Sequence, residues 1–108
     1  MLLFRGDRSR TPTYDLEEVQ RLVGQGPISS RVTKTAQRGA AALDLHGAQI
    51  VEAVLSLHPE HFYKSMEADL IPGLWQDVYH CRYEGKDLYI KLQIDATGAA
   101  VVIQFKER

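Results

Sequence analysis

The sequence lacks several features that would assign a protein to a particular class. It contains one cysteine, Cys81, which excludes an internal disulfide and favours a cytoplasmic protein. No hydrophobic run approaches the roughly 20 residues of a membrane-spanning helix. The apolar run from Leu2 to Phe4 is too short for the core of a signal peptide. The formal net charge is -1, so the overall charge does not predict a nucleic-acid partner.

Candidate metal ligands and nucleophiles are also sparse. The four histidines are scattered through the chain: His46, His58, His61 and His80. No spacing of histidine, cysteine, aspartate or glutamate matches a zinc site or a catalytic-metal site, so we expect no metal and no other cofactor. The strand position of Cys81 favours a buried, inert thiol over a nucleophile.

What the sequence does contain suits one domain with one hydrophobic core. Of its 108 residues, 44% are hydrophobic and 25% are charged. We therefore expect residues 1–108 to form a single domain. Residues 1–10 are predicted to be a flexible lead-in, and phosphate binding by Arg5, Arg8 and Arg10 is the alternative role for this segment.

Apolar residues recur at helical spacing in the first part of the chain. Residues 16–23 place them on one helical face, with Asp15 as the N-cap and Gly24 after the last turn. Three or four further elements are expected: a possible short strand at 28–33 and helices at 35–43, 47–57 and 59–67. Pro59 predicts the start of the last of these helices, because proline is tolerated in a first helical turn.

The spacing of apolar residues changes to two in the last third of the chain. Three strands are predicted: 75–83 ("WQDVYHCRY"), 87–94 ("DLYIKLQI") and 99–107 ("AAVVIQFKE"). The short connections "EGK" and "DATG" favour antiparallel hairpins. We therefore predict an α+β fold, in which N-terminal helices pack on one face of an antiparallel sheet.

Alternation along these strands separates a core face from a polar face. The core face is predicted to hold Leu88, Ile90, Leu92, Ile94, Val101, Ile103, Phe105, Trp75, Tyr79 and Cys81. The polar face is predicted to hold Gln76, His80, Arg82, Tyr89, Lys91, Gln93, Gln104 and Lys106. Tight hairpins would place Tyr89 opposite both His80 and Gln104, and Gln76 opposite Gln93. Asp77 falls on the core side, where a buried hydrogen bond or an edge position would accommodate it.

The composition of the polar face indicates a possible ligand. Its cationic and amide side chains surround a tyrosine and include no glutamate, which suits an anionic, planar ligand such as a nucleotide chain. The alternative is an ordinary solvated face of an antiparallel sheet. A local basic patch is compatible with the near-neutral total charge.

Two pentapeptides, "FYKSM" and "WQDVY", occur together with the shorter segments "RLV", "LDLHG", "LYIK" and "FKE". On these motifs the sequence resembles the MqsR family of bacterial toxins, from Thr11 to the final "FKER". Members of that family are messenger-RNA endonucleases of toxin–antitoxin systems, with a fold related to the RelE toxins. The resemblance implies a type II toxin that cleaves mRNA with a sequence preference and thereby inhibits translation and growth.

The resemblance also implies which residues act. The positions that match the family's catalytic residues are Lys64, Gln76, Tyr89 and Lys106. The remaining residues of the polar face are candidates for RNA binding: His80, Arg82, Lys91, Gln93 and Gln104. We expect Lys64 to reach over the sheet from the helix at 59–67, and an exposed lysine that only covers apolar neighbours is the alternative. A cognate antitoxin is implied, usually a zinc-containing protein with a helix-turn-helix part that contacts DNA; the zinc belongs to that partner.

The implied chemistry needs no metal. When the 2′-hydroxyl of RNA attacks the adjacent phosphorus, the enzyme supplies a base, positive charge for the phosphorane, and an acid for the leaving 5′-oxygen. Clustered lysines supply charge, and their mutual repulsion lowers a lysine pKa so that it can transfer protons. We expect Lys106 or Lys64 to transfer protons and Tyr89 to orient or donate, while Gln76 holds a phosphate or a base edge. The alternative is a non-catalytic module that binds RNA or a partner.

Overall fold

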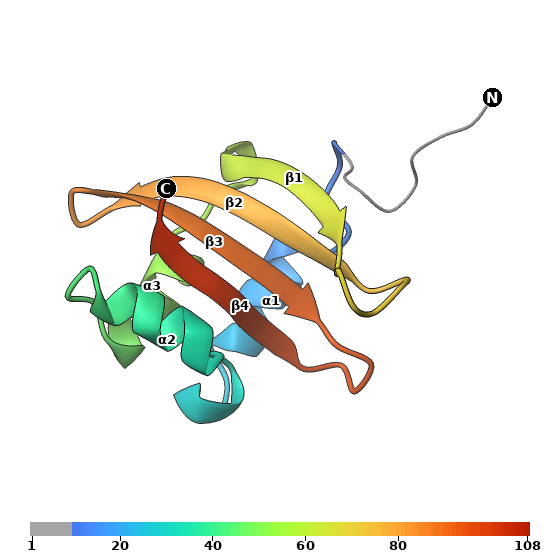
Figure 1. The fold of residues 1–108 in the computed structure, drawn as a ribbon, viewed down its shortest axis with the longest axis horizontal. Coiled ribbons are helices and arrows are strands. Elements are labelled where there is room, and N and C mark those ends of the chain that lie inside the picture. The colour runs from blue at the N-terminus through green and yellow to red at the C-terminus, as the bar shows by residue number, and fades with distance from the viewer. Residues whose placement is uncertain (1–9) are drawn as a thin grey trace.

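The computed structural model describes residues 10–108, so most of the predicted lead-in, including Arg5 and Arg8, lies outside the described residues. Within residues 10–108, three α-helices precede a four-stranded antiparallel sheet with the strand order β1-β2-β3-β4 (Figure 1). The helices are α1 (Leu16–Val23), α2 (Lys34–Ala41) and α3 (Gly47–Leu55). The strands are β1 (Phe62–Glu67), β2 (Trp75–Tyr83), β3 (Lys86–Ile94) and β4 (Ala100–Glu107). The predicted α+β class is therefore confirmed.

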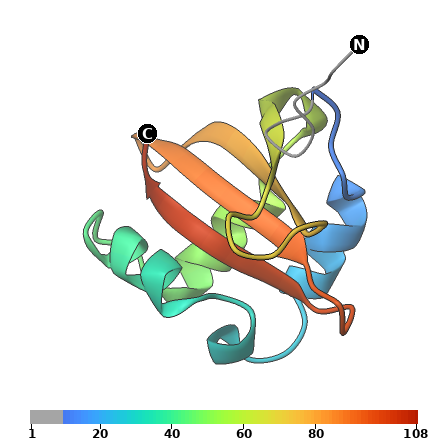
Figure 2. The same ribbon diagram turned by 45° about the vertical axis from the view of Figure 1, so that its right-hand side comes forward.

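The helices leave one face of the sheet open. Figures 1 and 2 show α1 and α3 behind the sheet and α2 alongside β4. Between the helices and the sheet lies the hydrophobic core, to which β3 contributes Leu88, Ile90 and Leu92, each at most 1% exposed. This layering buries one side of every central strand and presents the other side as the polar face.

Helix α2 approaches β4 so closely that one position requires glycine. A Cβ atom built on Gly39 would clash with the backbone carbonyl oxygen of Phe105. The contact is reinforced by Thr33, whose hydroxyl caps α2 at the amide of Ala36 and donates a hydrogen bond of 2.8 Å to the carbonyl of Ile103. The edge strand β4 is therefore covered by a helix, which prevents pairing with other chains there.

Two elements predicted from the sequence are wrong. The possible strand at 28–33 is a 3-10 helix, Ile28–Ser30, and only Val32 forms a bridge, to Val102. The helix predicted at 59–67 is a 3-10 turn, Pro59–His61, followed directly by β1. Pro59 does begin a helical turn, but the residues after it gain more by pairing with β2 than by continuing the helix, because tertiary contacts override weak local preference.

The pairing of β2 with β3 is as predicted, with His80 opposite Tyr89. The pairing of β3 with β4 differs: Tyr89 lies opposite Lys106, and Gln104 lies opposite Lys91, so the predicted pair of Tyr89 and Gln104 is wrong. One cause lies in the loop, which spans residues 95–99 because the Asp95 carboxylate accepts hydrogen bonds from the amides of Thr97 and Ala99.

The other cause is a β-bulge in β4. Leu92 pairs with Val102 and Lys91 pairs with Gln104, so Ile103 is an extra residue. Val102 consequently lies in the core at 0% exposure, whereas Ile103 is half-buried, and the predicted core parity of Val101 and Ile103 is wrong. The longer loop and the bulge each shift the pairing of β4 with β3 by one residue. A total shift of two residues restores the alternation, so Gln104 and Lys106 still lie on the polar face.

Candidate functional site

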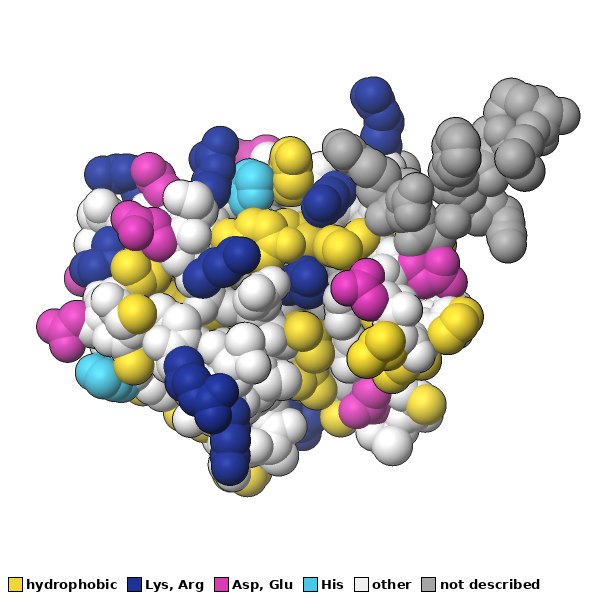
Figure 3. All heavy atoms as spheres, in the orientation of Figure 1, with side chains coloured by type: hydrophobic (Ala, Val, Ile, Leu, Met, Phe, Trp, Pro, Cys, Tyr) yellow, Lys and Arg dark blue, Asp and Glu magenta, His cyan; other side chains and the backbone are white. Residues whose placement is uncertain are grey.

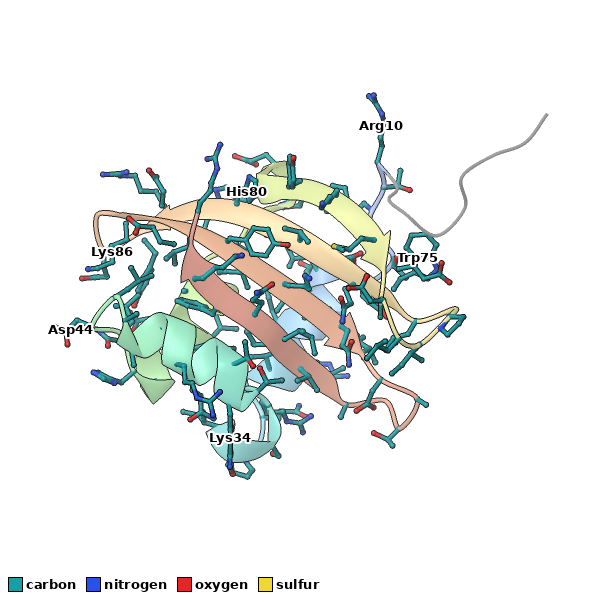
Figure 4. The ribbon with its side chains drawn as sticks, viewed as in Figure 1. Arg10, Lys34, Asp44, Trp75, His80 and Lys86 are labelled. Atoms are coloured by element: carbon teal, nitrogen blue, oxygen red, sulfur yellow. The ribbon has the colours of Figure 1, made fainter. Side chains whose placement is uncertain are left out.

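The candidate site lies on the open, polar face of the sheet. Figure 3 shows this face, where lysine and arginine side chains surround one histidine and a group of hydrophobic side chains. Tyrosine is coloured as hydrophobic in this figure. Figure 4 shows His80 on the same side of the sheet, toward the viewer. The structure brings Lys64, Tyr89, Lys91 and Lys106 around this histidine, from β1, β3 and β4.

A second bulge, in β1, determines how Lys64 reaches the site. Phe62 pairs with Tyr79 and Lys64 pairs with Val78, so Tyr63 is the extra residue. The rings of Phe62 and Tyr79 meet edge to face with centroids 5.6 Å apart on the core side. Because the bulge adds one residue, the consecutive side chains of Tyr63 and Lys64 both lie over the polar face. The prediction that Lys64 comes from a helix is therefore wrong, since it comes from the sheet itself.

Three rings form a row across the strands of this face. Tyr63 stacks on His80, with centroids 4.1 Å apart and planes inclined by 20°, and His80 is 5.7 Å from the Tyr89 ring. Tyr63 is 47% exposed, so its ring is accessible to a ligand. Our sequence interpretation missed Tyr63, because its segment was predicted to be a helix and was not assigned to either face of the sheet. Its position directly before Lys64 in the motif "FYKSM" is the sequence signal that could have identified Tyr63 as part of the site.

The ammonium groups of three lysines, Lys64, Lys91 and Lys106, surround this row of rings, and we call them the lysine cluster. The Nζ atoms of Lys106 and Lys91 lie 4.9 Å and 6.0 Å from the centre of the Tyr89 ring. Lys64 Nζ lies 5.6 Å from the centre of the Tyr63 ring. Within residues 10–108, no member of the lysine cluster forms a salt bridge with a carboxylate. Their charge is therefore available to an anionic ligand.

The surroundings of Lys91 disfavour its charged form. Burial lowers the pKa of the Lys91 ammonium group. Attraction by Asp69 opposes this effect on the pKa of Lys91, while repulsion by Lys64 and Lys106 adds to it. A phosphate bound at this place would relieve that repulsion, so the free protein holds a site suited to an anion.

His80 and Tyr89 are shifted in ways that keep both side chains neutral. Burial lowers the pKa of the His80 imidazole, and the positive charges of Arg108 and Lys64 lower it further. Burial raises the pKa of the Tyr89 phenol, and neighbouring Tyr63 adds to this effect. At neutral pH, His80 is therefore a free base and Tyr89 retains its proton.

The other predicted members of the site lie around this centre. Gln76 Nε2 donates a hydrogen bond of 3.0 Å to Gln93 Oε1, which joins the two amides into one unit beside the lysine cluster. Gln104 lies directly opposite Lys91. Arg82 is engaged in an ion pair of 2.8 Å with Asp87. Four elements of the sheet thus contribute polar groups to one continuous face.

Two further residues have structural roles. Asp77 is 1% exposed, and its carboxylate accepts hydrogen bonds from the amides of Thr13 (3.0 Å) and Tyr14 (2.9 Å). This confirms the expected buried hydrogen bond and ties the segment before α1 to the sheet. Cys81 is buried, and burial raises the pKa of its thiol, which agrees with an inert side chain.

The described part of the chain offers little support for other kinds of site. It holds no group of three or more histidine, cysteine, aspartate or glutamate side chains placed to bind a metal ion. None of the helices within residues 10–108 has the length and hydrophobicity that crossing a bilayer requires. The candidate site is therefore the open face of the sheet, where the ring row and the lysine cluster meet.

Known proteins resemble this chain over almost its whole length. A family model described as "Motility quorum-sensing regulator, toxin of MqsA" matches residues 11–107. The mRNA interferase toxin MqsR of Escherichia coli (strain K12) is 31% identical over 99 residues, which cover 92% of this chain and 97% of that protein. The matched range includes every residue of the ring row and of the lysine cluster.

Proposed function

The chain belongs to the MqsR family of toxins, and we propose that it is an mRNA interferase of a type II toxin–antitoxin system, cleaving mRNA with a sequence preference. The observation that carries this proposal is the lysine cluster around Tyr89, whose Lys106 ammonium lies 4.9 Å from the ring. Unpaired cations beside a neutral tyrosine suit a phosphodiester that gains charge as it reacts. An RNA chain also offers bases that stack on accessible rings such as Tyr63.

The catalytic roles follow from the charges on this face. Lys64 and Lys106 neutralise the phosphorane and assist proton transfer at its oxygens. Tyr89 retains its proton at neutral pH, because burial raises the pKa of its phenol, so it orients the substrate or donates to the leaving 5′-oxygen. Gln76, fixed by Gln93, holds a phosphate or a base edge. Side chains supply every part of this reaction, and we propose that no metal takes part.

The remaining polar residues bind the substrate in this proposal. Lys91 lies between Lys64 and Lys106 in their combined field and holds a phosphate oxygen. Gln104 lies opposite it on β4, and Gln93 supports Gln76. Arg82 can contact RNA at the margin of the face by exchanging Asp87 for a phosphate. Which bases are preferred depends on contacts that RNA makes across this face.

A cognate antitoxin is the second partner in this proposal. The matching family is described as the toxin of MqsA, so we propose that an antitoxin similar to MqsA inhibits this chain. We further propose that the antitoxin carries the zinc and the helix-turn-helix part that contacts DNA. Both mRNA and such an antitoxin would be met in the cytoplasm, which is where we propose the chain acts.

A second candidate function is favoured by one observation. The ring row and its lysines form an open, cationic platform, and such a platform binds single-stranded RNA even without cleaving it. In this alternative the chain would be a binding module on the same fold. The two functions differ in whether the phosphodiester bond is broken.

Cleavage of a defined mRNA by the purified chain tests the proposal. The products are mapped at single-nucleotide resolution, and a variant with Lys64, Tyr89 and Lys106 all replaced by alanine serves as control. We expect the parent to cut at a small set of sequences and the triple variant to leave the RNA intact. Expression of the parent should arrest growth unless the antitoxin is co-expressed. RNA that is bound but remains uncut by the parent would support the binding module instead.

A further inference from the structure

We propose that His80 is the proton acceptor of the cleavage reaction, its imidazole removing the proton of the attacking 2′-hydroxyl. The inference rests on the proposed RNA cleavage and deepens it by identifying the base. His80 lies at the centre of the ring row, between Tyr63 at 4.1 Å and Tyr89 at 5.7 Å from ring centre to ring centre. A ligand that occupies the polar face between Lys64 and Lys106 therefore meets this imidazole.

The hydrogen bonding of His80 is incomplete. Its Nε2 atom is enclosed and has no hydrogen-bond partner among the described residues. A buried polar atom left unpaired costs roughly 1–3 kcal/mol, so such atoms are rare and often mark functional sites. A buried ring nitrogen with a purely structural role is normally hydrogen-bonded. An RNA hydroxyl that displaces the groups covering Nε2 meets a nitrogen that has no existing bond to give up.

The other groups on the face are less suited to act as the base. Tyr89 keeps its proton, since burial raises the pKa of its phenol. Two carboxylates at the margin are engaged, Asp87 by Arg82 and Glu67 by the amide of Gly73. A third, Asp69, acts on the Lys91 ammonium by attraction. The members of the lysine cluster contribute most as cations, because the phosphorane gains negative charge. His80 differs from the lysines because an imidazole with a lowered pKa is mainly in its neutral, basic form at neutral pH.

The positive charges that face His80 favour its neutral form, which can accept a proton. From β1 it is faced by Tyr63 and Lys64, and from β3 by Tyr89. Lys106 of β4 and Arg108, which follows the end of β4, lie on the same side. Arg82, two residues along β2, is neutralised by Asp87.

These surroundings determine the direction of the pH dependence. Burial lowers the pKa of His80, and Arg108 and Lys64 lower it further, so the imidazole is unprotonated at neutral pH. Protonation below that pKa removes the base. Cleavage that depends on His80 should consequently fall as the pH is lowered.

The step balances without a co-reactant. The imidazole takes the proton of the 2′-hydroxyl as its oxygen forms a bond to phosphorus. The bond between phosphorus and the 5′-oxygen then breaks, and the departing oxygen takes a proton from Tyr89 or a lysine. The products are a 2′,3′-cyclic phosphate and a 5′-hydroxyl. Solvent returns the protein groups to their starting protonation, since the overall transesterification neither consumes nor releases protons.

Three variants separate proton transfer from ring stacking. His80→Phe keeps an aromatic ring between the two tyrosines, His80→Gln keeps polarity, and His80→Ala leaves space for free imidazole. We expect kcat/KM for RNA cleavage to fall by about 10²–10⁴-fold in each, the usual contribution of a general base. Added imidazole should restore part of the activity of His80→Ala alone. The acidic limb of the kcat/KM profile, present in the parent, should be absent from His80→Gln.

The controls distinguish failure of this inference from failure of the proposed function. Melting temperature and RNA affinity are measured for every variant, so loss of folding or binding is recognised. If the parent cleaves RNA and folded His80→Phe cleaves equally well, His80 is only a spacer between rings and the inference is overturned. An unchanged acidic limb in His80→Gln would overturn it too. If the parent itself leaves RNA uncut, the proposed function fails, whatever the variants do.

Discussion

Lys106 holds its ammonium nitrogen 4.9 Å from the centre of the Tyr89 ring, and the two residues face each other across the pairing of β3 with β4. Neither residue is in the hydrophobic core. A cation placed over an aromatic face is attracted by the ring quadrupole, by about 0.5–1 kcal/mol where water has access. In the proposed function, the unpaired Lys106 ammonium binds a phosphate of the RNA.

Replacing Lys106 by alanine or Tyr89 by phenylalanine should impair cleavage and leave folding largely intact. Each change removes a polar group from the open face, where substitutions cost about 0.5 kcal/mol or less. We expect RNA cleavage to fall by roughly 10²–10⁴-fold. Single-turnover cleavage and melting temperature are the measurements, with Lys34→Ala, at an exposed position of α2, as the matched control. Parent-like cleavage by both variants would mean that the roles inferred from the family do not apply to this chain.

Ile90→Ala should have the opposite effect, although Ile90 is adjacent to Tyr89. Ile90 is 0% exposed on the core side of β3, so truncation leaves a cavity and costs about 2–5 kcal/mol of unfolding free energy. The fraction that remains folded should cleave at a parent-like rate per molecule. Denaturant unfolding and activity normalised to folded protein test this. A stable but inactive Ile90→Ala would contradict the division of β3 into a core side and a catalytic side.

Removal of divalent metal should not affect cleavage. In the proposed reaction, lysines supply the positive charge and side chains move the protons, so excess chelator leaves the rate unchanged. The assay compares initial rates with chelator, with added magnesium and with added manganese. Activity that disappears with chelator and returns with either metal would exclude the proposed roles of the lysine cluster.

Gly39→Ala should destabilise the protein even though alanine favours helices. The added methyl group would meet the carbonyl oxygen of Phe105, so α2 must move away from β4. Overpacking of this kind costs typically about 1–3 kcal/mol, which exceeds the gain of about 1 kcal/mol in helix propensity. Ala41→Gly, at an exposed position of the same helix, is the control and should lose only the propensity term. A Gly39→Ala variant more stable than the parent would show that α2 can shift at no cost.

Asp77→Ala should loosen the segment before α1. Two backbone amides, of Thr13 and Tyr14, lose the carboxylate that accepts their hydrogen bonds. A donor left buried and unpaired costs roughly 1–3 kcal/mol, so we expect a loss of stability of that order or somewhat more. Hydrogen exchange at these amides should accelerate more than exchange in β3. Glu60→Ala, which removes an exposed carboxylate, is the control, and equal effects of the two changes would argue against this tether.

Much of the candidate site could be predicted from the sequence, because the alternation of side chains along a strand determines which residues share a face. Strand parity in 75–83 and 87–94 places His80 beside Tyr89 and Gln76 beside Gln93, and the structure has both relationships. The two-residue loop between β2 and β3, Glu84 and Gly85, leaves little freedom of register. The family motifs added Lys64, which parity could not assign because its segment was predicted to be a helix.

Only the tertiary structure determined where β1 and β4 depart from the regular alternation of side chains between the two faces of the sheet. The bulge at Tyr63 directs two consecutive side chains to the polar face, and the bulge at Ile103 restores the parity that the longer loop had shifted. A bulge depends on which residues a strand finds on its neighbour and on the packing of its other face, here Phe62 on Tyr79. Neither condition can be read from the strand itself. The sequence by itself therefore determined which residue types are available for catalysis, whereas the paired strands determined that Tyr63, Lys64 and Lys106 meet around His80.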